Sequence, residues 1–99
     1  MEFPKELNLL LRNFHQDFFR FDSPDEEIIW ALAAIGRKNR EAVKIYLDRI
    51  LAGPLDPDAL QRAWRNSPAE ISLKDAAQIP DMLRFIRARI DDPRLSDAP

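Results

Sequence analysis

The stretch FHQDFFRFDSPDEE, residues 14–27, contains the only histidine of the chain and four of its six phenylalanines. It closes on a strong helix-start pattern. The hydroxyl of Ser23 can cap the helix, Pro24 suits the first helical position, and Glu26 can reach back to the Ser23 N–H as a capping box. The acidic residues that follow Pro24 also lie where the helix dipole is positive. We therefore predict that a helix begins at Ser23.

Apolar residues at helical spacing on both sides of this stretch predict further helices. The predicted helices cover residues 4–13, 23–35, 39–52, 56–66 and 80–91. Gly36 and Gly53 are expected to end the second and third helices, and Asp56 is expected to cap the fourth. The basic run at 37–40 is predicted to form a turn that leads into the third helix.

The remaining segments are predicted to be connections. Residues 14–22 join the first two helices, although the first half of this segment could also extend the first helix. Residues 67–79 are expected to form a loop with a helical turn, although 70–74 alternate like a short strand, because a lone strand would have no partner in this chain. Residues 94–99 are expected to be a mobile tail. The sum is a single all-α domain, residues 1–99, built as a compact bundle of four or five helices.

The overall composition limits the functional classes. The chain has 15 basic and 17 acidic residues, and its net charge of −2 provides no general attraction for nucleic acid or an anionic membrane. The absence of cysteine excludes disulfides, thiol catalysis and cysteine-ligated zinc. Residues 1–6 lack a signal-peptide pattern, and the longest apolar run, 28–35, is too short to span a bilayer. We therefore expect a cytoplasmic protein that binds neither nucleic acid nor membrane.

The candidate catalytic pair is His15 with Asp17, which could serve as a general base and its orienting carboxylate. Side chains two positions apart point away from each other on a helix, and no nucleophile is indicated. We expect instead that His15, Gln16 and Asp17 hydrogen-bond backbone groups and fix the turn between two helices. One histidine, and two glycines placed as helix stops, provide neither a metal-ligand set nor a phosphate loop, so no metal or cofactor is expected.

Three features together resemble the immunity proteins of bacterial contact-dependent growth inhibition systems. They are Leu10, the aromatic-His-Gln-Asp-aromatic run at 14–18 and the acidic Ser-x-x-Glu helix start at 23–28. The Leu-Asp-x-Ile-Leu-Ala run at 47–52 agrees with the pattern of that family, and the rest of the chain is similar in outline. The resemblance implies a protein that catalyses no reaction. It would bind the C-terminal domain of one cognate toxin in the cytoplasm and cover the toxin's active site.

The acidic residues around the helix start are the candidate partner-binding residues. We expect Asp22, Asp25 and Glu27 to dock a basic partner, while Glu26 is occupied in the helix cap. Secreted toxin domains are often nucleases, and nucleases hold phosphates with basic surfaces. An acidic surface on the inhibitor would be attracted to such a toxin and would compete with its substrate.

The two tryptophans are expected in different places. Trp64 lies on a short, weakly apolar helix, so we expect it to be a partly exposed contact and a candidate partner-binding residue. Trp30 lies in the longest apolar run and is expected in the core. The free chain is expected to be a monomer or a weak dimer.

Two other functions stay open. A small DNA-binding regulator of the antitoxin type would use the basic cluster of Arg37, Lys38 and Arg40 and would bind duplex DNA in a salt-dependent way. The balance of charges disfavours this function. A structural or assembly subunit would self-associate through the Trp64 region and the final helix, without any toxin.

Overall fold

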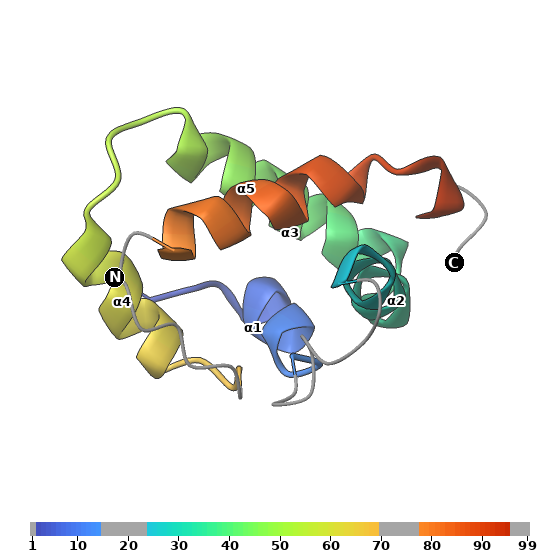
Figure 1. Cartoon of the computed structure of the whole chain (residues 1–99), viewed down its shortest axis with the longest axis horizontal. Helices are drawn as coiled ribbons and strands as arrows, with labels where there is room; N and C mark the ends of the chain where they lie inside the picture. The colour runs from blue at the N-terminus through green and yellow to red at the C-terminus, as the bar shows by residue number, and fades with distance from the viewer. Residues whose placement is uncertain (1, 15–23, 70–77, 96–99) are drawn as a thin grey trace.

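The computed structural model describes residues 2–14, 24–69 and 78–95, which form helices and connections and contain no strand (Figure 1). The elements are α1 (Lys5–Leu11), α2 (Pro24–Ile35), α3 (Arg37–Leu51), α4 (Pro57–Arg65), α5 (Gln78–Ile90) and the 3₁₀ turn η2 (Pro93–Leu95). The prediction of an all-α bundle is confirmed. The alternation at 70–74 lies outside the described residues.

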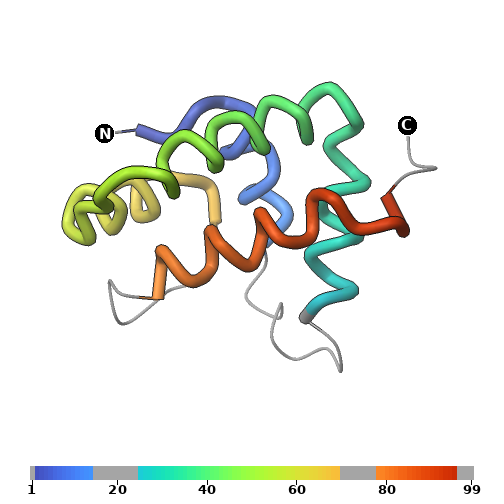
Figure 2. Tube along the Cα trace, turned by 90° about the horizontal axis from the view of Figure 1, so that it is seen from above, coloured from blue at the N-terminus to red at the C-terminus, as the bar shows by residue number. Residues whose placement is uncertain are grey.

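The two longest helices, α3 and α5, lie side by side and form the centre of the bundle (Figures 1 and 2). Helix α1 packs on α3, and α4 packs on α5. Helix α2 runs across the direction of the central pair and contacts α1, α3 and α5. The turn η2 follows α5 and returns the chain to α2. Each helix therefore has one side against the bundle and one side toward solvent.

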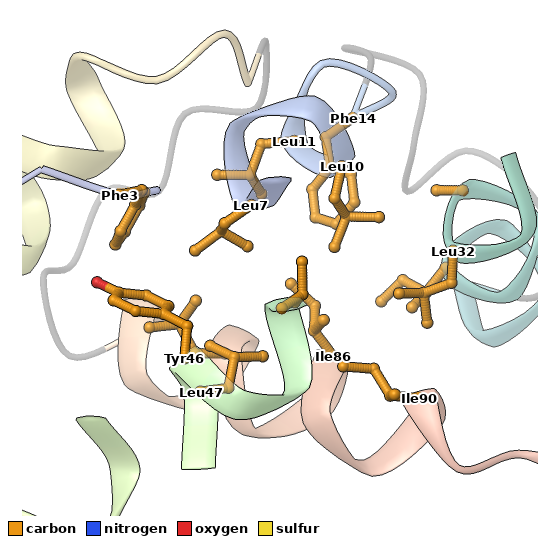
Figure 3. Close-up of a cluster of buried hydrophobic side chains, with 14 of the residues drawn as sticks. Phe3, Leu7, Leu10, Leu11, Phe14, Leu32, Tyr46, Leu47, Ile86 and Ile90 are labelled. Carbon is orange, nitrogen blue, oxygen red and sulfur yellow. The ribbon is translucent and has the colours of Figure 1, made fainter. Parts of the chain in front are cut away.

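The core lies where α1, α3, α5 and α2 meet (Figure 3). Leu7 and Leu10 of α1 point toward Leu47 of α3 and Ile86 of α5, and all four side chains are fully buried. Leu7 and Leu10 are three positions apart, and the helical period therefore places them on the same face of α1. Phe14, which follows α1, is also fully buried and extends this apolar face.

Helix α3 begins earlier than predicted. It starts at Arg37, directly after Gly36, so the basic run at 37–40 is the first turn of the helix and not a separate turn. Gly36 ends α2 as predicted, and its φ of 86° lies in the left-handed region, which glycine adopts without a steric penalty. The change of direction between α2 and α3 is therefore made by this one glycine.

Two side chains from the first turn of α3 donate hydrogen bonds to carbonyl groups at the end of α2. The amide Nδ2 of Asn39 donates to the carbonyl of Ile35 at 2.7 Å, and Nη1 of Arg40 donates to the carbonyl of Leu32 at 3.2 Å. Both carbonyls belong to the last turn of α2, where a helix leaves its carbonyl groups without partners in the helix. Arg40 is buried, and this burial lowers the pKa of its guanidinium. Repulsion from Arg37 lowers the same pKa by a smaller amount.

The predicted start of the fourth helix is confirmed. The carboxylate of Asp56 accepts a hydrogen bond of 3.0 Å from the backbone N–H of Asp58, and Pro57 occupies the first helical position. The helix ends at Arg65, within one residue of the expected end. Helix α5 begins at Gln78, two residues before the predicted start.

The predicted mobile tail is wrong at its first two residues. Arg94 and Leu95 belong to η2, and the side chain of Leu95 is buried. An apolar residue in this position anchors the end of the described chain to the bundle, next to the start of α2. Residues 96–99 lie outside the described part of the chain.

Candidate protein-docking surface

Trp30 is the most notable surface residue of α2, because 58% of it is exposed. The expectation that it lies in the core is wrong. Each residue of an α-helix turns the chain by about 100°. The side of α2 opposite Trp30 carries the buried residues Ile28, Ala31, Leu32 and Ile35. A helix in a small bundle buries only one side, so an uninterrupted apolar run leaves some of its residues in solvent.

Three further residues share the outer side of α2 with Trp30. Glu26 lies one turn before it and Ala34 one turn after it, and both are exposed. Glu27 borders the same side and is half-buried. We call Glu26, Glu27, Trp30 and Ala34 the α2 outer face. It combines a large aromatic side chain, two carboxylates and a small residue that leaves the indole accessible.

Trp64 is 4% exposed, so its predicted role as a partly exposed contact is wrong. Its ring meets that of Phe14 edge to face, with the ring centroids 6.4 Å apart and the planes at 63°. The other buried residues of α4 are Leu60 and Ala63, which share its inner face. A short helix with one apolar stripe can pack on the bundle only by burying that stripe. Trp64 is the largest residue of the stripe in α4, so it is buried.

Asp25 lies on the other side of α2, toward α5 and η2. Its carboxylate pairs with Nε of Arg89 at 2.5 Å and with Nη2 of Arg94 at 2.5 Å. The guanidinium of Arg94 makes the largest contribution to lowering the pKa of Asp25, and the guanidinium of Arg89 lowers it further. The structure therefore uses Asp25 to join the start of α2 to the end of the chain. Asp25 is not part of the α2 outer face.

The second carboxylate of this cluster is Asp92, which caps η2. It accepts hydrogen bonds from both the backbone N–H and the guanidinium of Arg94, the first at 2.8 Å. These bonds lower the pKa of Asp92 to about 2. Asp25 and Asp92 thus bind protons less readily in the folded chain than in the unfolded chain.

Acid is expected to weaken this cluster over a defined range. A carboxylate whose pKa is lower in the folded chain than in the unfolded chain stabilises the fold. This stabilisation is complete at a pH above the ordinary pKa of 3.8, and it is lost as the pH falls toward about 2. We predict that the midpoint of urea unfolding falls between about pH 4 and about pH 2, and that Asp92→Asn shows a smaller fall. Asp58→Asn, at an exposed site in α4, serves as the control and should follow the wild type. If the midpoint of urea unfolding fell equally in Asp92→Asn and in the wild type, the lowered pKa of Asp92 would not be a cause of the acid sensitivity.

A second ion-pair cluster joins α3 to α5. Arg87 of α5 bonds Asp48 of α3 through Nε at 2.5 Å and Asp91 through Nη1 at 3.0 Å, and Lys44 of α3 lies 3.4 Å from Asp91. Arg87 lowers the pKa of Asp48 and of Asp91. The arginines at the end of α5 are therefore paired with carboxylates and do not form a continuous basic stripe.

A shallow pocket of about 280 Å³ lies between the start of α3 and the end of α5. Its walls carry the basic residues Arg37 and Arg40 and the acidic residues Glu41, Asp91 and Asp92. Charges of both signs line this pocket, so it favours neither an anionic nor a cationic ligand.

Residues 2–14, 24–69 and 78–95 contain no group of three or more His, Cys, Asp or Glu side chains that could hold a metal ion. Within the same ranges, none of the helices combines the length and the apolar character needed to cross a membrane. The structural roles predicted for His15, Gln16, Asp17 and Ser23, and the docking role predicted for Asp22, fall outside the described residues. The same holds for the capping bond predicted between Glu26 and Ser23, because Ser23 is not described.

Comparison with protein-family models, with curated proteins and with solved structures found no match to this chain. The function is therefore inferred from the surface of the chain itself and from the sequence pattern at residues 14–28.

Proposed function

We propose that this chain is an immunity protein of a contact-dependent growth inhibition system, which binds and neutralises a cognate toxin domain in the cytoplasm. The observation that carries this proposal is the exposed Trp30 with Glu27 one turn before it. Tryptophan is among the residue types that contribute most to protein–protein binding when it becomes buried. An exposed tryptophan on a helix is thus a good anchor for a partner protein.

The charge of the α2 outer face indicates the chemistry of the partner. Glu27 lies one turn before the exposed indole on α2, and a carboxylate in this position favours a partner with a basic surface and an apolar pocket. A nuclease domain has a basic surface because it must hold phosphates. An acidic face speeds encounter with such a surface and competes with its substrate. Neutralisation by occlusion needs no catalytic residue or cofactor in the immunity protein.

The two alternative functions gain less support. Arg87 and Arg89 of α5 are paired with carboxylates, so they are poorly placed to contact the phosphates of a DNA duplex. Arg40 is buried against the carbonyl of Leu32. Self-association through Trp64 required an exposed indole, and that indole lies in the core.

The test is co-expression with the toxin domain encoded beside this chain. We expect growth of cells that produce the toxin to be rescued, and the two proteins to co-purify as a one-to-one complex. A toxin domain from an unrelated system, produced at the same level, should remain lethal and should not co-purify. Absence of both rescue and complex with the cognate domain would refute the proposal.

A further inference from the structure

The outer side of α3 carries an arrangement that the proposed function does not use. Ile45 is 63% exposed and lies on the side of α3 opposite the fully buried Val43 and Leu47. Glu41 lies one turn before Ile45 and Arg49 one turn after it, and both are exposed. We call Glu41, Ile45 and Arg49 the α3 outer face.

Beyond the first turn, residues 37–40, the charged residues of α3 fall into two groups. Lys44 and Asp48 turn toward α5 and pair with Asp91 and Arg87. Among residues 2–14, 24–69 and 78–95, Glu41 and Arg49 form no ion pair, and Arg49 contacts the ring of Tyr46 with its guanidinium 5.6 Å from the centroid. The α3 outer face therefore presents one negative and one positive charge at equal distances from an exposed apolar residue.

This arrangement is complementary to itself. A two-fold axis through Ile45 would place a second α3 antiparallel to the first. Ile45 would then meet its own copy, and each Glu41 would meet an Arg49 of the other molecule. Interfaces of this kind, in which one patch pairs with the same patch, are the usual basis of symmetric dimers. We propose that the α3 outer face is a self-association surface that binds a second copy of this chain in the antiparallel orientation.

The contact would be small, since it centres on one aliphatic side chain and two exposed ion pairs. Interfaces of this size are weak, and surface ion pairs add little each and are screened by salt. The dimer should therefore form at high protein concentration and low salt. It uses a different helix from the α2 outer face and does not depend on the immunity function.

Charge reversal tests the proposal. The probe is sedimentation velocity of the purified chain over a concentration series reaching about 1 mM, where weak association is populated. We expect the wild-type sedimentation coefficient to rise with concentration, and less so in added salt. Glu41→Arg places two positive charges against each other in the dimer, and Arg49→Glu places two negative charges, so each variant should associate at least about tenfold more weakly.

An equal mixture of the two variants gives the sharpest result. One variant then presents two positive charges and the other two negative charges, so the antiparallel pairing is restored and association should return. Arg65→Glu makes the same charge change on an exposed residue of α4 and should associate like the wild type. Circular dichroism checks that all variants fold. A wild-type chain that stays monomeric, single variants that associate normally, or a mixture that stays monomeric would each overturn the proposal.

Discussion

Replacing Trp64 by alanine is expected to lower the free energy of unfolding by about 3–5 kcal/mol. The indole is buried, and its edge-to-face contact with Phe14 ties α4 to the segment that follows α1. Alanine would leave a cavity that the short helix cannot fill, because only Leu60 and Ala63 join Trp64 on its inner face. Small domains have total stabilities of about 5–15 kcal/mol, so this loss is a large part of the whole.

The measurement is equilibrium unfolding in urea, followed by circular dichroism at 222 nm. Trp64→Phe keeps an aromatic ring and should lose clearly less stability than Trp64→Ala. Trp30→Ala is the matched control, since it removes the same side chain from the surface, and its effect should stay within about 0.5 kcal/mol. Equal losses for the two alanine variants would show that the burial of the two tryptophans has been assigned wrongly.

Helix class and several helix ends could be predicted because their causes are local. Asp56 followed by proline set the start of α4, and Gly36 set the end of α2. The start of α3 could not be predicted in the same way. Asn39 and Arg40 donate to the last turn of α2, so the helical state of residues 37–40 is supported by contacts with the preceding helix. Without these contacts, four polar residues after a glycine are typical of a turn.

The surface was harder to predict than the fold. The sequence shows that α2 has more apolar residues than one side can hold, and this excess was the signal that one of them, Trp30, would be exposed. Which side faces solvent depends on the position of α1, α3 and α5. Asp25 was grouped with the docking residues because it belongs to the acidic run at the helix start. Its partner Arg94 is 69 positions away, and sequence spacing predicts no contact at that separation. Among the described acidic residues, Asp25 lies on one side of α2, and Glu26 and Glu27 lie on the other.

Replacing Trp30 by alanine is expected to weaken binding of the cognate toxin domain by about 2–4 kcal/mol, or roughly 30- to 1,000-fold in the dissociation constant. The reason is that a tryptophan side chain offers a large contact area and has few rotatable bonds, so its burial at an interface costs little ordering of the side chain. Titration calorimetry with a catalytically inactive toxin domain measures the change. The free energy of unfolding measured for the same variant separates lost binding from lost folding.

Two further variants locate the docking surface. Ile45→Ala removes an equally exposed apolar side chain from α3, and it should leave toxin affinity unchanged because α3 lies outside the α2 outer face. Glu27→Gln should slow association and reduce its dependence on salt, because a charge at the edge of an interface acts mainly on the rate of encounter. If Trp30→Ala bound the toxin like the wild type while Ile45→Ala bound it weakly, the toxin would dock on α3. Self-association and toxin binding would then compete for one surface.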